Sequence, residues 1–521
     1  MRTDRAIVAY AFAALCLLLQ ACGSLPPSTD KPESHHLPPA SDTPSAKYTQ
    51  AEVDQHQHQS GFRLLTLSTN ALLSRIALVD HAKHSIDLQY YIFASDMTGH
   101  LLMQHLLTAA DRGVRVRILI DDNNFTDEDH LFDALNSHPN IKVRLFNPLQ
   151  TRNPSAISRA TQFVLDWRRL NRRMHNKSLI VDNSVAIIGG RNIGDPYFDA
   201  GSDTHFRDLD VVAIGPVVQQ ASAAFDDYWN CDAAYPLKSL TNADDSAQRL
   251  AAARQILQGK VRAFKESDYA QTVLDELPTG PTADRRGAWF WGEAELVADQ
   301  PEKIETSRDV PALRIGSKLK AMIDGAQHQI LATTPYFIPG DEGTEHLISL
   351  VQRGVTVKVL TNSLASTDET AAHAGYVHYR KRLLEGGVML YELRPSMGQA
   401  QPSTTLGKSS GVSLHAKTIV VDGRQVFIGS LNMDQRSKLL NTEMGIIVDS
   451  PGLAQAVTDF FNTAALPANA FQVTLDPSSH RLSWHATDDG KDVVYHEEPD
   501  ANTKKRVEVS FLRMLPIDGL L

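Results

Sequence analysis

Short apolar runs alternate with amphipathic stretches along most of this chain. Runs at 85–93, 112–120 and 143–146 are rich in Ile, Val, Leu and aromatic residues and are bounded by Gly, Asn or Pro, which is typical of β-strands. Between them, residues 101–112 carry apolar side chains at the spacing of an α-helix. This alternation predicts an α/β fold in which helices flank a mostly parallel mixed sheet.

The same order of elements recurs in the second part of the chain. Matching strand-like runs and an intervening helical pattern lie at 328–338, 344–353, 353–361 and 388–391. Two further runs, 179–181 and 419–421, are continuously apolar, as expected of central strands that are buried on both faces. The sequence therefore predicts two copies of one structural unit.

The copies are expected to form two tandem domains, because 521 residues exceed one ordinary hydrophobic core. We predict that the first domain covers 59–290 and the second 291–521. Their boundary falls within 240–305, a region without a counterpart in the other copy. Within it, residues 276–286 combine Pro and Gly with charged residues, as turns do.

Four polar residues also repeat, at a constant offset of 240 residues. His175, Lys177, Asp182 and Asn192 recur as His415, Lys417, Asp422 and Asn432. On a strand, residues i and i+2 share a face, so the His and Lys of each copy point the same way. Each Asn follows a glycine-rich turn, where small residues let the backbone approach a ligand closely. One such pair would be a weak signal, but its duplication indicates a shared site.

Two imidazoles, two ammonium groups and two amides suit a reaction at a phosphodiester. The ammonium and amide groups would bind the phosphate oxygens and lower the barrier electrostatically. One imidazole would attack phosphorus, and the other would act as general acid and then as general base. These roles require opposite protonation states of the two rings. Because four donors already carry the phosphate charge, no metal or other cofactor is required.

The repeated pattern resembles the defining motif of the phospholipase D superfamily, HxKxxxxD followed by a glycine-rich turn and Asn. Flanking segments are similar to those of the bacterial C-type cardiolipin synthases and lie at 170–174, 189–194, 361–364, 373–376 and 441–445. The resemblance extends over about residues 60–521 and includes Gly190, where most of the superfamily has Ser. It implies a site between the halves, with His175 as the nucleophile and His415 as the acid/base, although the order of these roles stays open.

Carboxylates should orient the imidazoles. Asp208 and Glu443 are the predicted residues, because each precedes an apolar strand at an equivalent place in the repeat. Surface carboxylates are the alternative. Asp182 and Asp422 lie seven residues beyond the motif histidines, at the far end of the strand, and are predicted to be structural.

Two further segments have alternative interpretations. Arg168, Arg169, Arg172 and Arg173 occupy four of six positions. They form either a solvated helix face or a site that binds anionic lipid headgroups, since guanidinium groups match phosphate. The apolar C-terminal segment 511–521 either lies on a membrane or closes the core.

Composition narrows the classes of function. The net charge of −10 argues against a protein that binds nucleic acid, which needs a basic face. Cys231 is the only cysteine beyond the N-terminal region, so no disulfide or zinc site can be built from cysteines of the body, and Cys231 is predicted to be a small core residue.

The N-terminus has the layout of a secretory leader over residues 1–21. Arg2 and Arg5 precede an apolar run, 6–19, that is short for a membrane span. The run ends Leu-Gln-Ala-Cys22, which resembles a bacterial lipobox, at which lipid is attached to the cysteine. An ordinary leader or an uncleaved anchor is the alternative. Gly rather than Asp after Cys22 resembles lipoproteins sorted to the outer membrane, so a lipid-anchored protein of the cell envelope, facing the periplasm, is expected.

Residues 22–58 are expected to form a flexible tether. Residues 24–50 are rich in Pro, Ser, Thr and His and have almost no large apolar residue, so they bury too little surface to become ordered. The histidines of this segment are interpreted as solvated rather than metal-bound: His35, His36, His56 and His58.

The family resemblance implies a phosphatidyl transferase that makes cardiolipin from phosphatidylglycerol, with phosphatidylethanolamine as donor. A phospholipase D that hydrolyses phospholipids to phosphatidic acid is the alternative, because it forms the same covalent intermediate. The acidic charge and the predicted lipid anchor disfavour a nuclease. Both intact motifs disfavour an inactive lipid-binding protein.

Overall fold

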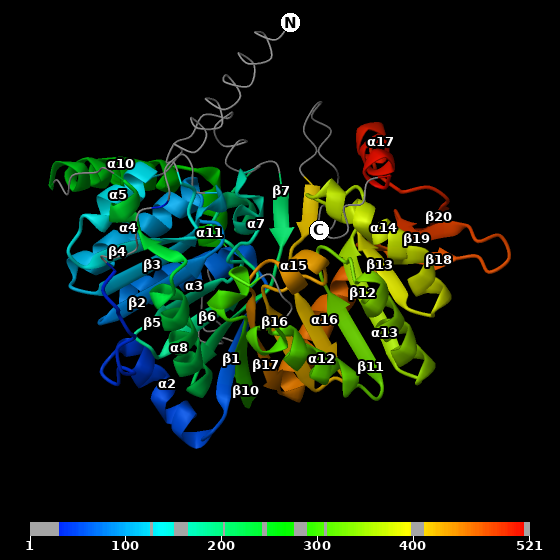
Figure 1. Cartoon of the computed structure of the whole chain (residues 1–521), viewed down its shortest axis with the longest axis horizontal. Coiled ribbons are helices and arrows are strands. Elements are labelled where there is room, and N and C mark those ends of the chain that lie inside the picture. Colours follow the sequence, from blue (N-terminus) through cyan, green and yellow to red (C-terminus); the bar gives the residue numbers. More distant parts are fainter. Residues whose placement is uncertain are drawn as a thin grey trace, which may run out of the picture.

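The protein folds into two α/β halves that lie side by side (Figure 1). A computed structural model describes residues 25, 31–124, 129–150, 165–201, 204–241, 247–275, 289–306, 310–396 and 411–514. The leader 1–21, Cys22 and residues 276–286 of the predicted boundary lie outside these described residues.

The first half is built on a mixed sheet. Three strands run parallel: β2 (Ser85–Tyr90), β3 (Arg115–Asp121) and β4 (Ile141–Phe146). Antiparallel strands follow on the β2 side in the order β5 (Ser178–Val181), β6 (Val185–Gly189), β8 (Asp210–Ile214) and β1 (Ser60–Leu65). On the other side, β9 (Ala234–Pro236) pairs antiparallel with β4.

The second half repeats this order. Its parallel strands are β11 (Gln329–Thr333), β12 (Thr356–Asn362) and β13 (Met389–Leu393). The antiparallel strands on the β11 side are β15 (Thr418–Val421), β16 (Gln425–Gly429) and β17 (Met444–Asp449). Three antiparallel strands extend the β13 side: β18 (Ala470–Leu475), β19 (Leu482–Asp488) and β20 (Lys491–Tyr495).

One strand joins the two sheets. The first residues of β10 (Phe290–Ala298) pair antiparallel with β1, and its later residues pair antiparallel with β17. The α/β class and the two repeated units are confirmed. Within the main sheet of each half, parallel pairing, which we expected to dominate, is confined to three strands, because the motif strands return antiparallel to their neighbours.

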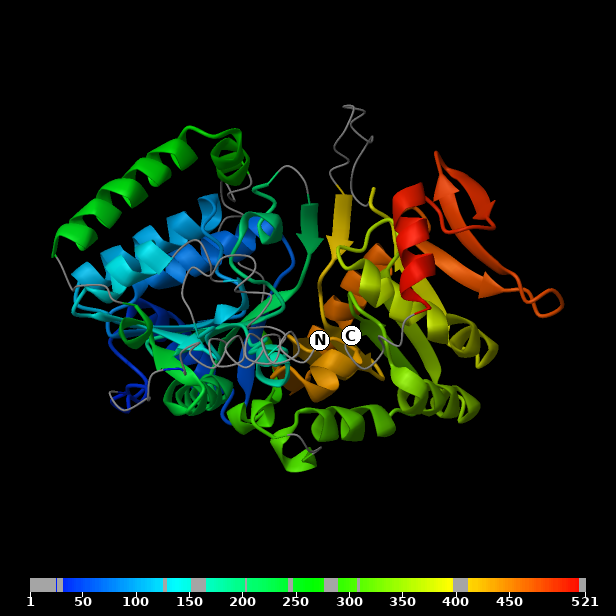
Figure 2. The ribbon, with the colours of Figure 1, turned by 45° about the horizontal axis from the view of Figure 1, so that its top comes forward.

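Helices cover both faces of each sheet. In the first half they are α3 (Ser68–His81), α4 (Met97–Asp111), α5 (Asp129–Asn136), α8 (Pro216–Asn230), α9 (Leu237–Leu240), α10 (Ala247–Lys265) and α11 (Asp268–Asp275). In the second half they are α12 (Gly316–Asp324), α13 (Gly340–Gln352), α14 (Thr370–Glu385), α15 (Gln435–Leu439), α16 (Pro451–Ala464) and α17 (Thr503–Leu512). Figure 2 shows α10 lying along the outside of α4, with which it packs.

The central hydrophobic core is shared by both halves. It contains residues of α8 and α16 together with strand residues of both sheets, including Ile188 and Ile428. Two outer clusters lie beneath α4 and beneath α13. Cys231 is half-buried at the edge of the central core. The halves therefore meet across a buried interface, and a site between them is held rigidly from both sides.

The described part of the expected tether is packed on the first half, contrary to the prediction of a flexible segment. Residues 31–42 run along the domain, where the carbonyl oxygens of Pro32 and Ser34 accept hydrogen bonds from Arg144 and Arg117. His36 lies 2.7 Å from the Asp226 carboxylate. A helix, α2 (Pro44–Gln55), follows. This packing could not be predicted from composition, because polar contacts with the domain, rather than burial of apolar groups, hold the segment.

Within the described residues, no helix combines the length and the apolar character needed to cross a membrane.

Candidate active site

Strand pairing between the halves positions His415. The short strand β7 (Thr204–Arg207) of the first half pairs in parallel with β14 (Gly411–Leu414) of the second. The backbone N–H of His415, just after β14, donates to the carbonyl oxygen of Arg207 at 2.8 Å. Asp208 is the next residue after β7, so this pairing brings the carboxylate beside the imidazole.

A similar backbone contact positions His175. Met174 forms a parallel bridge with Thr442. The backbone N–H of His175 donates to the carbonyl oxygen of Thr442 at 2.8 Å. In return, the backbone N–H of Thr442 donates to the carbonyl oxygen of Arg173 at 2.9 Å. Glu443 follows Thr442, so it lies beside His175 as Asp208 lies beside His415.

Each imidazole is therefore held by a carboxylate of the opposite half. His175 Nδ1 lies 2.8 Å from Glu443 Oε2, and His415 Nδ1 lies 2.5 Å from Asp208 Oδ2. Both carboxylates and both imidazoles are buried. A carboxylate at Nδ1 favours the tautomer with its proton there, which leaves the Nε2 lone pair for reaction. The structure thus brings together the four predicted residues, with a crossed pairing that the sequence did not indicate.

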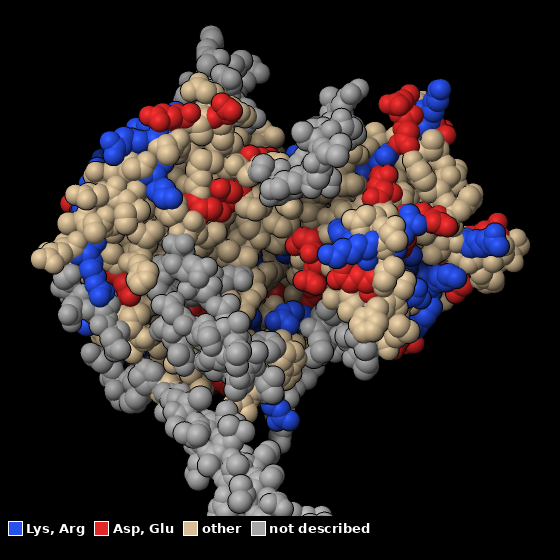
Figure 3. Space-filling model, turned by 90° about the horizontal axis from the view of Figure 1, so that it is seen from above, with Lys and Arg blue, Asp and Glu red and all other residues tan. Residues whose placement is uncertain are grey.

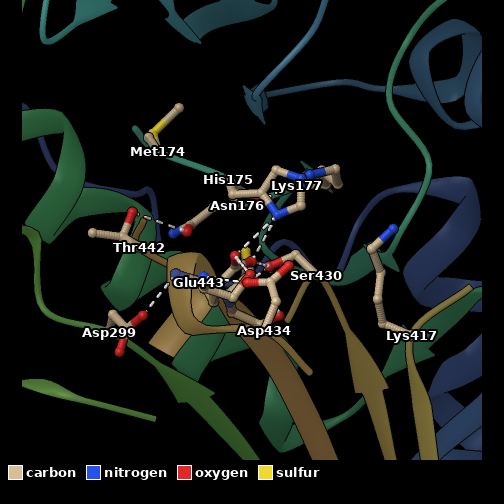
Figure 4. A network of polar contacts seen from close by, with 12 residues as sticks. Met174, His175, Asn176, Lys177, Asp299, Lys417, Ser430, Asp434, Thr442 and Glu443 are labelled. Carbon is tan, nitrogen blue, oxygen red and sulfur yellow. Dashed lines mark hydrogen bonds and ion pairs between the residues drawn. The ribbon is translucent and has the colours of Figure 1, made fainter. Parts of the chain in front are cut away.

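Two serines and an aspartate support Glu443, and Figure 4 shows Ser430 and Asp299 among them. The hydroxyl of Ser430 donates to Oε2 at 2.5 Å, and that of Ser437 donates to Oε1 at 2.8 Å. The backbone N–H of Glu443 donates to Asp299, which also pairs with Lys303 at 2.7 Å. Neither Asp299 nor Lys303 was predicted from the sequence, because both lie in the region 240–305, for which we found no counterpart in the other copy.

Asp208 has a different support, because Gly190 stands where the second half has Ser430. A Cβ atom at Gly190 would lie 2.2 Å from Asp208 Oδ1. The glycine therefore makes room for the carboxylate. Asp208 Oδ1 accepts a hydrogen bond from the N–H of Leu209 at 2.7 Å instead of from a serine hydroxyl.

The two motif lysines are buried beside the histidines. Lys177 Nζ donates to the carbonyl oxygen of His175 at 2.6 Å, and Lys417 Nζ lies 2.9 Å from His415 Nδ1. Burial lowers the pKa of Lys417 to about 8 and lowers the pKa of Lys177 well below its ordinary value. A phosphate anion between these groups would raise both pKa values and favour the charged ammonium forms, because an opposite charge opposes the effect of burial.

Burial disfavours protonation of both imidazoles in the ligand-free site. Burial lowers the pKa of His175 to about 4, and Glu443 opposes this shift only in part. Burial also lowers the pKa of His415 to about 3; Lys417 adds to the effect and Asp208 opposes it. The opposite protonation states that the chemistry requires are thus disfavoured before substrate binds. A bound phosphate anion would favour protonation of one ring.

The motif asparagines differ in their contacts. The Asn192 amide donates to the Tyr197 hydroxyl at 2.7 Å, and its Oδ1 accepts a hydrogen bond from the N–H of Ile92 at 3.2 Å. Asn432 Oδ1 is buried and has no hydrogen-bond partner among the described residues. Tyr197 also packs edge-on against His415, with ring centroids 5.2 Å apart, and Tyr91 packs in the same way on His175 at 5.0 Å. Sequence reasoning singled out neither tyrosine.

Asp182 and Asp422 lie away from the reacting groups, in equivalent turns. The carboxylate of Asp182 accepts hydrogen bonds from three consecutive backbone N–H groups, at residues 83–85. Asp422 does the same at residues 327–329, with all three distances at 2.8 Å. These contacts fix the loop that enters β2 or β11.

The arginine cluster is mostly engaged within the protein. Arg173 is buried and pairs with Asp121 at 3.1 Å. Arg172 donates to the carbonyl oxygen of Ile304 at 2.7 Å, and Arg169 pairs with Asp166 at 2.6 Å. These three contacts do not fit capture of lipid headgroups, because each guanidinium group is held by partners within the protein. Arg168 alone among the four is exposed.

The described residues contain no group of three or more His, Cys, Asp and Glu side chains that could hold a metal ion. The groups available to bind an anion at the centre of the site are Lys177, Lys417 and the buried amides. A neutral imidazole, buried cations and a rigid interface together suit nucleophilic attack on a phosphodiester.

Known proteins share this architecture. The family model described as "Cardiolipin synthase, PLD-like domain" matches residues 76–229 and 319–464. Cardiolipin synthase C of Escherichia coli (strain K12) is 40% identical over 477 residues, which cover 90% of this chain and 97% of that protein. An uncharacterized protein of Helicobacter pylori (strain ATCC 700392 / 26695) is 33% identical over 484 residues, 91% of this chain and 92% of that protein.

A solved structure shows the same fold at low sequence identity. Phosphatidylserine synthase from Haemophilus influenzae Rd KW20 is 13% identical, with a TM-score of 0.55, and the match covers 91% of this chain and 99% of that one. Both repeats of the chain match one family model, and a relative is 40% identical across nearly the whole chain. The chain therefore belongs to the cardiolipin synthase, PLD-like domain family of the phospholipase D superfamily.

Proposed function

We propose that this protein is a phosphatidyl transferase that makes cardiolipin from phosphatidylglycerol and a second phospholipid, with phosphatidylethanolamine as the donor. The observation that carries this proposal is the pair of crossed His–carboxylate contacts, with a buried lysine beside each imidazole. Similarity to a relative named cardiolipin synthase C supports the choice of reaction.

The first step forms a phosphatidyl-histidine. Nε2 of His175 attacks the phosphorus of the donor, and the bond from phosphorus to the headgroup oxygen breaks. His415 gives a proton to that oxygen, and the headgroup alcohol leaves. Glu443 stabilises the positive charge that forms on His175, while Lys177 and Lys417 bind the phosphate oxygens.

The second step reverses the proton movement. His415, now neutral, takes a proton from a hydroxyl of phosphatidylglycerol. The hydroxyl oxygen attacks phosphorus, the bond to His175 Nε2 breaks, and cardiolipin leaves. Water in place of the hydroxyl would give phosphatidic acid, so the same residues would also serve a phospholipase D.

Lipid analysis of a bacterium that lacks its own cardiolipin synthases, expressing this protein, tests the proposal. Cardiolipin should appear with the wild type and disappear when His175 or His415 is replaced by Ala. Phosphatidic acid as the main product would instead support the hydrolase. Activity should survive EDTA, because lysines rather than a metal ion neutralise the phosphate.

The order of the histidines can be tested on purified variants supplied with labelled donor lipid. His415→Ala should accumulate lipid-labelled protein, because it retains the nucleophile but resolves the intermediate slowly. His175→Ala should stay unlabelled. Label on His175→Ala alone would reverse the two roles.

We also propose that the protein is lipid-anchored at Cys22 in the bacterial cell envelope, on the periplasmic face of the outer membrane. The lipobox-like sequence before Cys22 and the lipid substrates of the proposed reaction support this location. Metabolic labelling with a fatty acid, compared between wild type and Cys22→Ser, tests the lipid anchor. Membrane fractionation tests whether the protein lies in the outer membrane.

A further inference from the structure

The last described helix, α17, shows an apolar row to solvent. Val507, Phe511 and Met514 are 64%, 57% and 74% exposed. Their spacing of four and three residues places them on one side of the helix and its final turn. On the opposite side, Val509 is buried against Leu364 and Ala374 of the second half. The helix is thus held to the domain by one face and leaves a second apolar face uncovered.

Basic side chains lie on α17 and at its C-terminal end. Lys504 precedes Val507 by three residues and therefore shares its side of the helix. Arg513 lies at the C-terminal end of α17. Both side chains are exposed. Residues 503–514 contain four basic residues and one acidic residue, although the whole chain has a net charge of −10. Exposed apolar residues beside cations are typical of helices that lie in the interface of an anionic membrane.

The helix is fastened beside the active site. Lys505 Nζ donates to the carbonyl oxygens of Thr367 at 2.7 Å and Ala365 at 3.1 Å. The next residue, Asp368, accepts a hydrogen bond from Tyr336 at 2.9 Å. Burial raises the pKa of Asp368, and the nearby Lys417 and Lys505 oppose that shift, so one carboxylate lies near both α17 and the motif lysine.

The position of α17 also suits contact with a flat surface. Figure 1 shows α17 on the upper side of the molecule, and Figure 3, which looks down on that side, shows a hollow between the two halves. A surface that touched this side would meet the helix and the hollow together.

We propose that the exposed face of α17 docks on an anionic phospholipid bilayer. Val507, Phe511 and Met514 would enter the boundary between headgroups and acyl chains, while Lys504 and Arg513 would bind lipid phosphates. This inference rests on the proposed function, because a phospholipid substrate requires the catalytic centre to reach a membrane. Docking through α17 would hold the site against the bilayer independently of any anchor at Cys22.

Vesicle flotation tests the face directly. The full chain carrying Cys22→Ser is used throughout, so that no attached lipid contributes to binding. Binding to vesicles of phosphatidylglycerol and phosphatidylethanolamine should weaken about tenfold or more in the triple variant Val507→Ser, Phe511→Ser, Met514→Ser, since each apolar contact is lost. Leu466→Ser is the matched control, because Leu466 is 51% exposed but lies outside α17. It should bind like its Cys22→Ser parent.

Charge and insertion are tested separately. Lys504→Glu with Arg513→Glu should abolish the preference for phosphatidylglycerol vesicles over phosphatidylcholine vesicles. Phe511→Trp keeps an apolar side chain at the centre of the row. Its fluorescence should be quenched by brominated lipids beyond the quenching seen in the parent, which tests insertion even if the triple variant fails to fold.

Several outcomes would overturn the docking proposal. One is equal vesicle binding by the triple variant and its parent; another is no extra quenching of Phe511→Trp. A parent that sediments as a dimer, with a monomeric triple variant, would assign the face to a second copy of the chain. A different outcome separates the docking proposal from the proposed function. If vesicle binding depends on α17 but the protein makes no cardiolipin, the docking proposal stands and the proposed synthase is rejected.

Discussion

At the scale of single residues, each candidate catalytic imidazole depends on a carboxylate from the other half of the chain. Glu443 is held by two hydroxyl groups, whereas Asp208 has a backbone N–H and the space left by Gly190. The two histidines therefore have different surroundings, although their motifs are alike. This asymmetry gives a physical basis for assigning them different roles.

Gly190→Ala should reduce the rate of transfer by about tenfold or more. The new methyl group would meet Asp208 Oδ1 at 2.2 Å, so the carboxylate must move and His415 would lose its alignment. Gly259→Ala is the control, because its Cβ would meet no atom within 4 Å. Steady-state assays with both variants check this expectation. Full activity in Gly190→Ala would show that the position of Asp208 is not critical.

Stability should fall as the pH falls from about 6.5 to about 4. Burial lowers the pKa of His175 to about 4, so the unfolded chain, with an ordinary value near 6.5, binds a proton that the native site resists. Glu443 acts in the same direction at lower pH, because the balance of its contacts with His175 and Lys177 lowers its pKa despite burial. The sign is the same for both groups: the stability that they supply is present at neutral pH and is lost on acidification.

Thermal unfolding of the double variant His175→Asn, Glu443→Gln checks this dependence. It replaces the titrating pair by neutral amides, so its melting temperature should change less between pH 7 and pH 4.5 than that of the wild type. His58→Asn, at an exposed histidine, should retain the wild-type slope. If the melting temperatures of all three proteins change equally with pH, the buried pair makes no net contribution to the pH dependence of stability.

The repeated motif allowed most of the site to be predicted at this scale. Spacing alone identified the histidines, lysines and asparagines, and strand position identified Asp208 and Glu443. The crossed pairing could not be predicted, because the partners lie 268 and 207 residues apart and meet only when the halves dock. Asp299 was missed for a related reason: it supports the site from outside the repeat.

At the scale of elements, each motif aspartate connects two neighbouring strands through hydrogen bonds. Asp182 follows β5 and caps the loop entering β2, the strand that pairs antiparallel with β5. Asp422 does the same between β15 and β11. Both residues have positive φ, at 53° and 52°, a conformation that Asp tolerates better than most residues.

Asp182→Ala should destabilise the protein by about 2–4 kcal/mol, because three backbone N–H groups lose a charged acceptor. Asp182→Asn should destabilise the protein less than Asp182→Ala, since asparagine keeps one acceptor oxygen and tolerates the positive φ. Asp489→Ala measures the backbone cost alone: Asp489 also has positive φ, at 49°, in the exposed turn between β19 and β20. Denaturant unfolding checks the order. A loss in Asp182→Ala no larger than in Asp489→Ala would mean that the hydrogen bonds add nothing.

The repeat predicted the elements of the central layers and missed those that join or extend them. The runs at 85–93 and 328–338 became β2 and β11, because continuous apolar residues specify buried strands. β10 was not predicted, although it lies beside β17 as β1 lies beside β8, because the sequence of this region showed no match to the other copy. The fate of the C-terminal segment depended on tertiary packing: of its described residues, Phe511 and Met514 are exposed and do not close the core.

At the scale of the whole molecule, the packed segment 31–58 changes the expected reach of the protein from its anchor. The chain is held to the first half from about Lys31 onward, so only eight residues lie between the proposed anchor, Cys22, and the folded body. Such a span reaches at most about 30 Å. A short connection would keep the catalytic body close to one leaflet rather than let it range widely.

Anchoring should therefore favour transfer over hydrolysis in cells. An anchored enzyme meets donor and acceptor lipids at high effective concentration, whereas a soluble one meets them by encounter in three dimensions. Cys22→Ser, exported by an ordinary leader, should make less cardiolipin in cells and yet keep its full rate on lipid dispersed in detergent. Measuring cardiolipin and phosphatidic acid side by side checks both expectations. If phosphatidic acid dominates even for the anchored protein supplied with phosphatidylglycerol and phosphatidylethanolamine, anchoring does not select the acceptor, and the hydrolase replaces the synthase as the function of this site.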